Sequence, residues 1–216
     1  MAFPTTGILD TFTGLDETSP PNSNWTNLYN GLKITSNAVS GNTTTNYNAG
    51  YYNVSDFGPD CEAYFTIVVK PPDNASNIGV VLRIDTTNLN AYIAKVIKGS
   101  VGVEFLALVR IDGGAETELD SIETAYSVGD KVGISAIGNI LTLWHCPVGT
   151  GVWGIVTTYD ITSDTPKYTA AGKIGIVENV PGSSFARVDD FGGGAYVPPP
   201  AGVSRGFMTT MSKFWG

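Results

Sequence analysis

The sequence is poor in the residues that metal sites and nucleophilic enzymes require. Its 216 residues include one histidine, His145, and two cysteines, Cys61 and Cys146. A structural or catalytic zinc ion needs three or four such ligands close together, so this set argues against zinc. A dyad of His145 with Cys146 also fails, because adjacent strand residues point to opposite faces. No serine lies in a G-x-S-x-G turn or a comparable nucleophile context.

Charge is also scarce and is mostly of one sign. Charged residues make up 15% of the chain, and the net charge is −8. An acidic surface repels phosphates and anionic lipids, so nucleic acid and membrane are not expected partners. No apolar run approaches the length of a membrane span. The start, MAFPTTGILDTF, lacks the basic and apolar regions of a signal peptide, so we expect no export and two free thiols.

Helical periodicity is missing as well, and strand periodicity takes its place. No segment of helical length carries apolar residues at positions i, i+3, i+4 and i+7. About a dozen short segments instead alternate apolar and polar residues, with glycine-containing hairpin turns at 99–100, 113–114 and 138–139. The sequence therefore predicts an all-β protein, an antiparallel two-sheet jelly-roll β-sandwich over residues 1–196.

The last twenty residues, 197–216, differ from the rest and are predicted to form a C-terminal arm. Three consecutive prolines, 198–200, cannot supply ladder hydrogen bonds and favour a stiff extended segment. The arm has two basic residues and no acidic one, and large aromatic side chains are common interface anchors. We expect it to contact a second copy, another protein or its own sandwich through Arg205, Phe207, Met208, Met211, Phe214 and Trp215.

The order of several short motifs resembles a known superfamily. The motifs are D-T-F (10–12), E-A-Y-F-T-I (62–67), G-D-K-V-G-I-S-A-I-G-N-I-L-T-L (129–143), T-T-Y-D (157–160) and D-D-F-G-G-G (189–194). Over residues 7–196 this pattern is similar to the concanavalin A-like lectin/glucanase superfamily, in its laminin-G-like branch. The resemblance implies a concanavalin A-like sandwich. Members include lectins, carbohydrate-binding modules, glycoside hydrolases and domains on bacteriophage virions.

The function that we expect first is structural. An aromatic arm after a proline spacer resembles the ending of small phage structural proteins. We therefore expect a non-enzymatic virion surface protein, a capsid decoration or fibre-associated subunit made in the host cytoplasm. Its arm would dock to other virion proteins or to copies of itself, and it would need no cofactor. One alternative is a carbohydrate-binding module with a cell-surface glycan as its ligand, and a second is a glycoside hydrolase.

The hydrolase alternative rests on one acidic segment, Glu118-Leu119-Asp120-Ser121-Ile122-Glu123. It resembles the E-x-D-x-x-E pattern by which glucanases of this superfamily place a nucleophile, a supporting Asp and an acid/base on one strand. A retaining mechanism needs two carboxylates about 5 Å apart. In a regular strand Glu118 and Asp120 share a face and Glu123 lies on the other, so a bulge would be required. A solvated acidic strand is the simpler interpretation.

Two further sites follow from the resemblance. Aromatic faces on an exposed rim bind sugars by stacking, and the Asn/Thr-rich stretch 22–53 carries Trp25, Tyr47, Tyr51 and Tyr52. Half-buried packing is the simpler interpretation of these tyrosines. The resemblance also suggests a structural calcium ion where the terminal strands meet, and hard oxygen ligands there would come from Asp10, Asp189 and Asp190.

Overall fold

Alternating apolar and polar residues build two antiparallel sheets in the computed structural model, which describes residues 3–44, 47–72, 75–182 and 184–198. Sheet A has eight strands. Their order is β13 (Gly154–Asp160), β12 (Ile140–Cys146), β11 (Lys131–Ile137), β6 (Cys61–Val69), β15 (Arg187–Ala195), β4 (Val39–Gly41) and β3 (Leu32–Ile34), with β1 (Ile8–Asp10) paired to β15.

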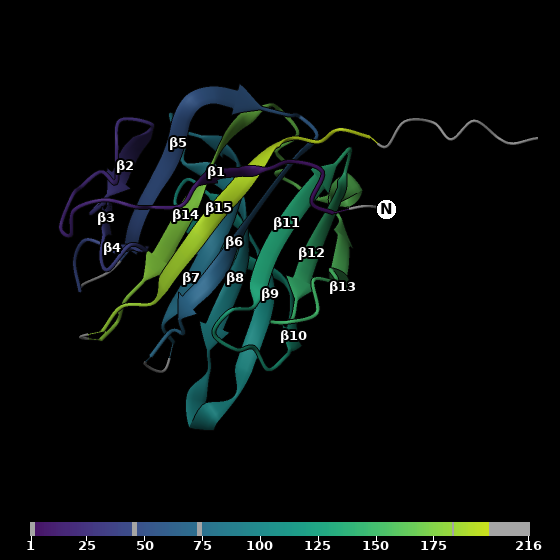
Figure 1. Ribbon diagram of the computed structural model, residues 1–216. Coiled ribbons are helices and arrows are strands. Elements are labelled where there is room, and N and C mark those ends of the chain that lie inside the picture. The colour runs from purple at the N-terminus through teal and green to yellow at the C-terminus, as the bar shows by residue number, and fades with distance from the viewer. Residues whose placement is uncertain (1–2, 45–46, 73–74, 183, 199–216) are drawn as a thin grey trace, which may run out of the picture.

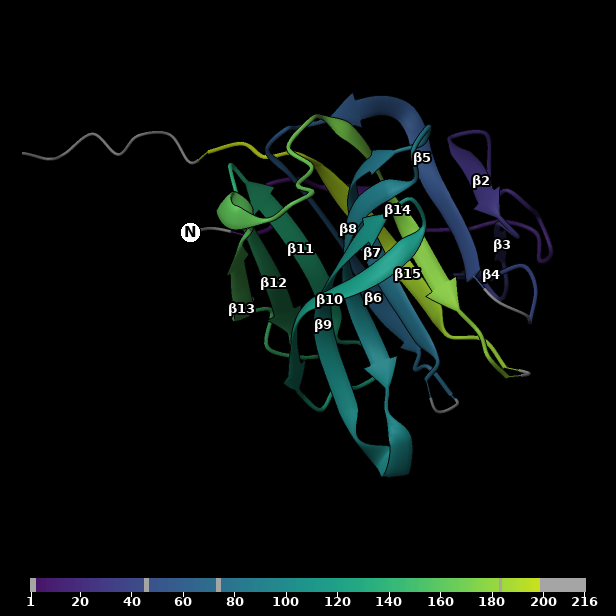
Figure 2. The same cartoon turned by 180° about the vertical axis from the view of Figure 1, so that it is seen from behind.

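Sheet B has seven strands, and two short 3-10 helices complete the elements of the described residues. The order in sheet B is β10 (Ala115–Glu123), β9 (Glu104–Asp112), β8 (Asn90–Lys98), β7 (Asn77–Asp85), β14 (Gly172–Asn179), β5 (Tyr47–Phe57) and β2 (Trp25–Tyr29). The 3-10 helices are η1 (Ser100–Gly102) and η2 (Ile161–Ser163). The two sheets lie face to face, sheet A nearer the viewer in Figure 1 and sheet B nearer in Figure 2. The predicted all-β sandwich is thus confirmed, and no described helix is long and apolar enough to span a membrane.

The main core lies between the two sheets and is built from every second residue of each strand. On β7, Ile78, Val80 and Leu82 are fully buried and point toward sheet A, where Phe65 and Ile134 are fully buried as well. Each such side chain contributes about 1.5–3 kcal/mol through removal from water. The alternation of side chains along each strand therefore decides which residues form the core between the two sheets.

The predicted hairpin turns are confirmed where glycines supply left-handed backbone. Gly113 and Gly114, between β9 and β10, have φ of 58° and 87°, and Gly138, between β11 and β12, has φ of 56°. Such turns match the twist of the flanking strands and favour glycine. The β8–β9 connection is longer than predicted, because η1 follows Gly99 before β9 begins.

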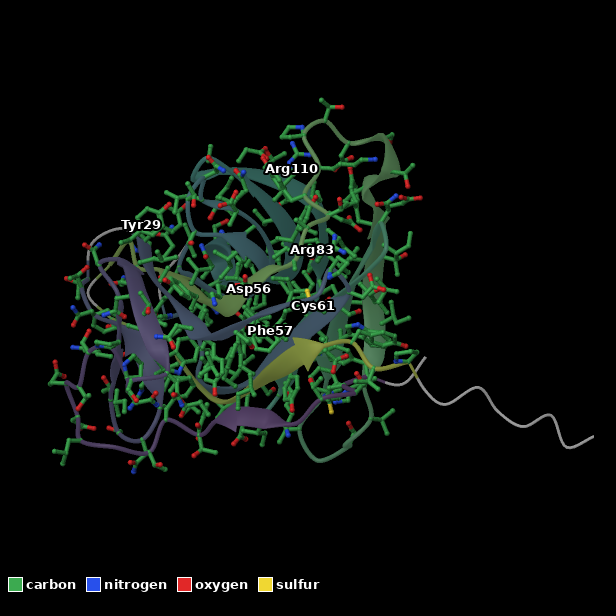
Figure 3. The ribbon with its side chains drawn as sticks, turned by 90° about the horizontal axis from the view of Figure 1, so that it is seen from above. Tyr29, Asp56, Phe57, Cys61, Arg83 and Arg110 are labelled. Carbon is green, nitrogen blue, oxygen red and sulfur yellow. The ribbon has the colours of Figure 1, made fainter. Side chains whose placement is uncertain are left out.

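One end of the sandwich is tied together by a buried arginine. The Arg83 guanidinium donates to the backbone carbonyls of Pro59 (2.9 Å), Tyr168 (3.0 Å) and Gly138 (2.9 Å), in three separate loops. Cys61 lies beside Arg83 in Figure 3, and burial raises the pKa of its thiol to about 11. Both cysteines, Cys61 and Cys146, are free and buried. This cluster serves the fold, and Figure 3 shows it well apart from Tyr29, which belongs to the site described next.

Candidate functional site

The outer face of sheet B is apolar, although one face of an antiparallel sheet is commonly polar. Eight small or aliphatic side chains on this face form a second buried cluster, made of Ala49, Val81, Ile84, Ala91, Ile93, Ala107, Val109 and Val177. Their strands are therefore apolar on both faces. Something must cover the second face, because exposed apolar patches of this extent are rare in soluble proteins.

Sheet B covers this face itself by curling its two edges toward each other. Glu116 of the edge strand β10 pairs with Lys95 of β8 and lies close enough to Tyr47 of β5 to raise the pKa of its phenol. At the mouth, the Tyr29 hydroxyl from β2 lies against Gly114, where an added Cβ would come within 3.0 Å of that oxygen. Figure 2 shows the β9–β10 hairpin in front of the rest of the sheet. Residues from both edges of one sheet thus enclose its concave face.

A pocket remains inside the curl, with a cavity volume of about 100 Å³. Its polar lining side chains are Tyr29, Tyr47, Asn90 and Glu116. The larger aliphatic residues that line it are Leu28, Val81, Ile84, Leu89, Ile93, Ile111, Ile176 and Val177.

A buried ion pair braces the curl. The Lys95 side chain is 2% exposed and the Glu116 side chain 29% exposed. Lys95 also lies 5.9 Å from the centre of the Tyr47 ring, and its stem runs over Gly79, where an added Cβ would lie 3.2 Å from the lysine Cγ. Burial lowers the pKa of Lys95 against the opposing effect of Glu116, and burial followed by Glu116 raises the pKa of Tyr47 to about 12. A buried charge needs its partner, so this pair holds β10 over the sheet.

Lys95 and Glu116 are not among the site residues predicted from the sequence. A signal was present, since Lys95 is a single charge in the otherwise apolar stretch AYIAKVI, at a position in phase with Ala91 and Ile93. A charge at such a position indicates a buried partner, although a single sequence does not say which acid supplies it.

The four predicted sugar-stacking residues divide between two faces. Trp25 is 2% exposed, lies in the main core and donates its indole N–H to Asp10 (2.8 Å), and Tyr52 is 8% exposed in the same core. The prediction of a surface platform is wrong for these two, because strand alternation turns them between the sheets. Tyr47 and Tyr51 lie on the opposite face of β5, where they are half-buried against the outer apolar cluster of sheet B.

The acidic segment carries a bulge, but the bulge does not assemble a catalytic pair. The register of β10 shifts between Glu118 and Asp120, so that Glu118 lies opposite Val109 and Glu123 opposite Phe105, both on the outer face. Their partners are four residues apart on β9, which is roughly 13 Å of strand. Glycosidase carboxylates are about 5 Å or about 6.5–9.5 Å apart.

The remaining member of the acidic segment points the other way. Asp120 lies opposite Leu108, on the side of the main core, and accepts a 2.5 Å hydrogen bond from Thr157 of β13 in sheet A. Glu118 and Glu123 are both exposed. The three carboxylates therefore do not converge on one substrate position.

The predicted calcium ligands come near one another without forming a metal site. Strand β1 pairs with β15, and the Asp189 pKa is raised by burial and then by the nearby Asp190 and Asp10. Asp10 already accepts hydrogen bonds from the Phe12 amide, Asn22 and the Trp25 indole. Among the described residues, no three His, Cys, Asp or Glu side chains are grouped to hold a metal ion. In the described residues, Asp10, Asp189 and Asp190 therefore do not form a three-carboxylate cluster, and a structural calcium ion there stays a prediction.

The predicted arm falls almost wholly beyond the part of the chain that the structure describes. Its contact residues, Arg205, Phe207, Met208, Met211, Phe214 and Trp215, lie outside the described residues. The described part of the arm begins at Val197, which is 59% exposed and donates its amide to the Thr5 hydroxyl (3.2 Å).

Comparison with known proteins finds similar structures and no similar sequences. No protein-family model and no curated protein sequence matches the chain. The carbohydrate-binding module CBM66 from Bacillus subtilis has a TM-score of 0.59 at 14% identity, covering 78% of this chain and 93% of that one. The exoplasmic/lumenal domain of VIP36, in a form bound to Ca²⁺ and Man3GlcNAc, has a TM-score of 0.58 at 11% identity, covering 82% and 87%.

A third similar structure is a larger enzyme. The xylan β-1,4-xylosidase from Bacillus halodurans C-125 has a TM-score of 0.61 at 15% identity, covering 86% of this chain but only 38% of the enzyme. Identities this low show a shared fold and no more. The chain is thus a lectin-like sandwich of the type found in carbohydrate-binding modules, lectins and parts of glycosidases.

Proposed function

We propose that this chain is a non-enzymatic binding module that holds a carbohydrate ligand at the mouth of the sheet B pocket. The observation that carries the proposal is the pocket itself, where tyrosine rings and hydrogen-bonding groups meet on a concave face. Sugar sites combine apolar contact from aromatic faces with a few placed polar groups. Tyr29 offers both, and Asn90 and Glu116 add further polar atoms to the lining.

The shared fold supports this proposal in general terms. Two of the similar proteins carry a carbohydrate in their descriptions, one as a binding module and one as a glycan-bound domain. The separation of Glu118 from Glu123 along β10 favours binding over hydrolysis, because a two-carboxylate mechanism needs both groups at one glycosidic bond.

A glycan array probed with the full chain tests the proposal. We expect binding to a defined set of glycans, and at least about a tenfold loss of affinity in Tyr29→Ala, because that change removes a ring and a hydroxyl from the mouth. The matched control is Tyr196→Ala, since Tyr196 follows β15 of sheet A and does not line the pocket. An array without any signal, or equal losses in both variants, would count against carbohydrate binding at this site.

We also propose that the protein acts on a virion surface, with the C-terminal arm as its anchor. The basic and aromatic composition of the arm supports this role, and so does the exposure of Val197 where the arm leaves the sandwich. Deletion of residues 199–216 should abolish incorporation into particles or self-association. The same deletion should change the free energy of unfolding by less than about 0.5 kcal/mol, as for surface changes generally. Unchanged assembly after this deletion would refute the anchoring role.

A further inference from the structure

The sheet B pocket is more apolar than a site that encloses a sugar ring. Its inner wall is made of aliphatic side chains such as Ile93, Ile111 and Val177. Hydrogen-bonding side chains reach it from Tyr29, which is 58% exposed, and from Tyr47, Asn90 and Glu116. A pyranose carries hydroxyls around its whole edge, and each one buried without a partner is unfavourable. A sugar ring therefore belongs at the mouth, and the interior suits a group without polar atoms.

The size of the pocket limits what that group is. The cavity volume is about 100 Å³, and the cavity is open at its mouth. An enclosed apolar cavity of about 150 Å³ accommodates benzene and stays free of water. The sheet B pocket has about two-thirds of that volume but is open, so it fits one six-carbon ring whose edge reaches the mouth, or a short branched alkyl group. Water is disfavoured there, because most of the interior wall is aliphatic and offers few of the polar partners that a buried water needs.

The pocket is held open from both edges of the sheet. On one side, the Lys95–Glu116 pair fixes β10, and on the other, Tyr29 meets the β9–β10 turn at Gly114. Alanines stand at two of the lining positions, Ala49 and Ala91, where larger aliphatic side chains would fill the space. A loosely packed core would collapse onto an empty space. Here the braced strands and the small residues of the wall keep the space open.

We infer that the pocket binds an apolar substituent of the ligand, about the size of a phenyl ring. The substituent is carried by a polar group that stays at the mouth beside Tyr29, Asn90 and Glu116. The ligand class is thus an aryl- or alkyl-substituted glycoside rather than an unsubstituted sugar. This inference rests on the proposed function for the sugar part, whereas the apolar part follows from the pocket alone.

The test titrates the full chain with three probes while the methyl NMR signals of Ile93, Ile111 and Val177 are followed. The probes are phenol, phenyl β-D-glucopyranoside and methyl β-D-glucopyranoside. We expect saturable shifts with both phenyl compounds, and at least about tenfold weaker binding of the methyl glycoside. No shift with either phenyl compound would overturn the inference.

Two variants fill the pocket from different walls. If one of them fails to fold, the other still tests the inference. Ala91→Leu and Ala49→Val should each abolish the phenol-induced shifts, while Ala195→Leu, at an exposed alanine of sheet A, should leave them unchanged. Shifts that persist in a folded Ala91→Leu or Ala49→Val variant would place the probe elsewhere and overturn the inference. Phenol binding with a blank glycan array would support the apolar pocket and refute the sugar ligand. Glycan-array binding without shifts of the Ile93, Ile111 and Val177 methyl signals would support the sugar ligand and refute the apolar pocket.

Discussion

The apolar residues on the outer faces of the two sheets are covered in opposite ways. On sheet A, the N-terminal segment lies over the face, and Phe3 fills the space left by Gly133, where an added Cβ would lie 2.5 Å from the phenyl ring. The ring stacks on Trp144 at 4.7 Å and meets Trp153 edge-on at 4.8 Å. On sheet B, no described side chain fills the pocket, and the sheet curls around it.

The difference teaches which of these two hollows can take an apolar group, because Phe3 fills the hollow over Gly133. The hollow on sheet A is occupied by the chain itself, and the Thr5 and Thr6 amides also bind the buried Glu62 at 2.5 and 2.7 Å. That face contributes stability. The pocket on sheet B is braced by Lys95 and Glu116 and stays open to a ligand. The four predictions that follow test this contrast.

The largest expected effect concerns Glu178, on which both faces depend. This buried carboxylate of β14 accepts hydrogen bonds from the amides of Gly41 in β4 (2.5 Å) and Ala186 (2.6 Å), and so links the two sheets. Burial raises its pKa to about 8, against the opposing effect of these two amides. Between its usual value near 4.5 and about 8, the folded state holds a proton that the unfolded state has lost.

The contribution of Glu178 to stability should therefore be complete below pH 4.5 and fall as the pH rises to about 8. The expected slope is up to about 1.4 kcal/mol per pH unit. Urea unfolding at several pH values measures it. Glu178→Gln cannot ionise, so its free energy of unfolding should lack this slope, and an equal slope in both proteins would show that Glu178 is not the source.

The next largest effect is expected from removing the Lys95–Glu116 ion pair on sheet B. Glu116→Ala leaves the Lys95 ammonium buried without its partner, which should destabilise the protein by about 3 kcal/mol and abolish binding at the pocket. Lys95→Met combined with Glu116→Leu should recover most of the stability, because a well-packed apolar pair replaces a buried ion pair at little cost. The free energies of unfolding of the wild type, Glu116→Ala and the double variant, measured by chemical denaturation, check both expected changes in stability. A Glu116→Ala protein as stable as the wild type would mean that the pair does not brace the curl.

A slightly smaller effect is expected on the filled face. Phe3→Ala removes the ring from Trp144 and Trp153 and should cost about 2–3 kcal/mol, at the low end for buried phenylalanine because the residue lies near the chain end. Ligand binding on sheet B should stay within about twofold of the wild type, a change below 0.5 kcal/mol. Thermal unfolding and the phenol titration measure the two quantities. A loss of binding that matches the loss of stability would remove the contrast between the faces.

The smallest effect is expected from the acidic strand. Glu118→Gln and Glu123→Gln alter exposed side chains of β10, so each should change stability by less than about 0.5 kcal/mol. Neither should change binding at the pocket, unlike Glu116→Ala on the same strand. Hydrolysis of β-glucans by the wild type that disappears in Glu118→Gln would instead establish a glycosidase.

Much of the fold could be predicted from the sequence because its signals are local. Apolar alternation locates the strands, and glycines at 113–114 and 138–139 mark hairpin turns that need left-handed backbone. The phase of β5 was harder. Tyr51 and Tyr52 are adjacent, so alternation sends one of them inward, and only the pairing of β5 with β2 and β14 decides which one.

The candidate site could not be predicted, because it depends on how far sheet B curls. Curling joins Glu116 to Lys95 and Tyr29 to Gly114 across strands that are not neighbours in the sheet. Local periodicity carries no information about such contacts. The bulge between Glu118 and Asp120 is a similar case, because the segment reads as an ordinary alternating strand and the extra residue appears only in the register with β9.

The most direct test of the contrast between the faces is a crystal structure of the full chain with a glycan or aryl glycoside selected by the array. Density for the sugar beside Tyr29, Asn90 and Glu116, with the apolar substituent between Ile93 and Val177, is the predicted result. Phe3 should remain stacked on Trp144 in the same crystal. Ligand density over the Trp144 and Trp153 face, with Phe3 displaced and the sheet B pocket unchanged, would contradict it.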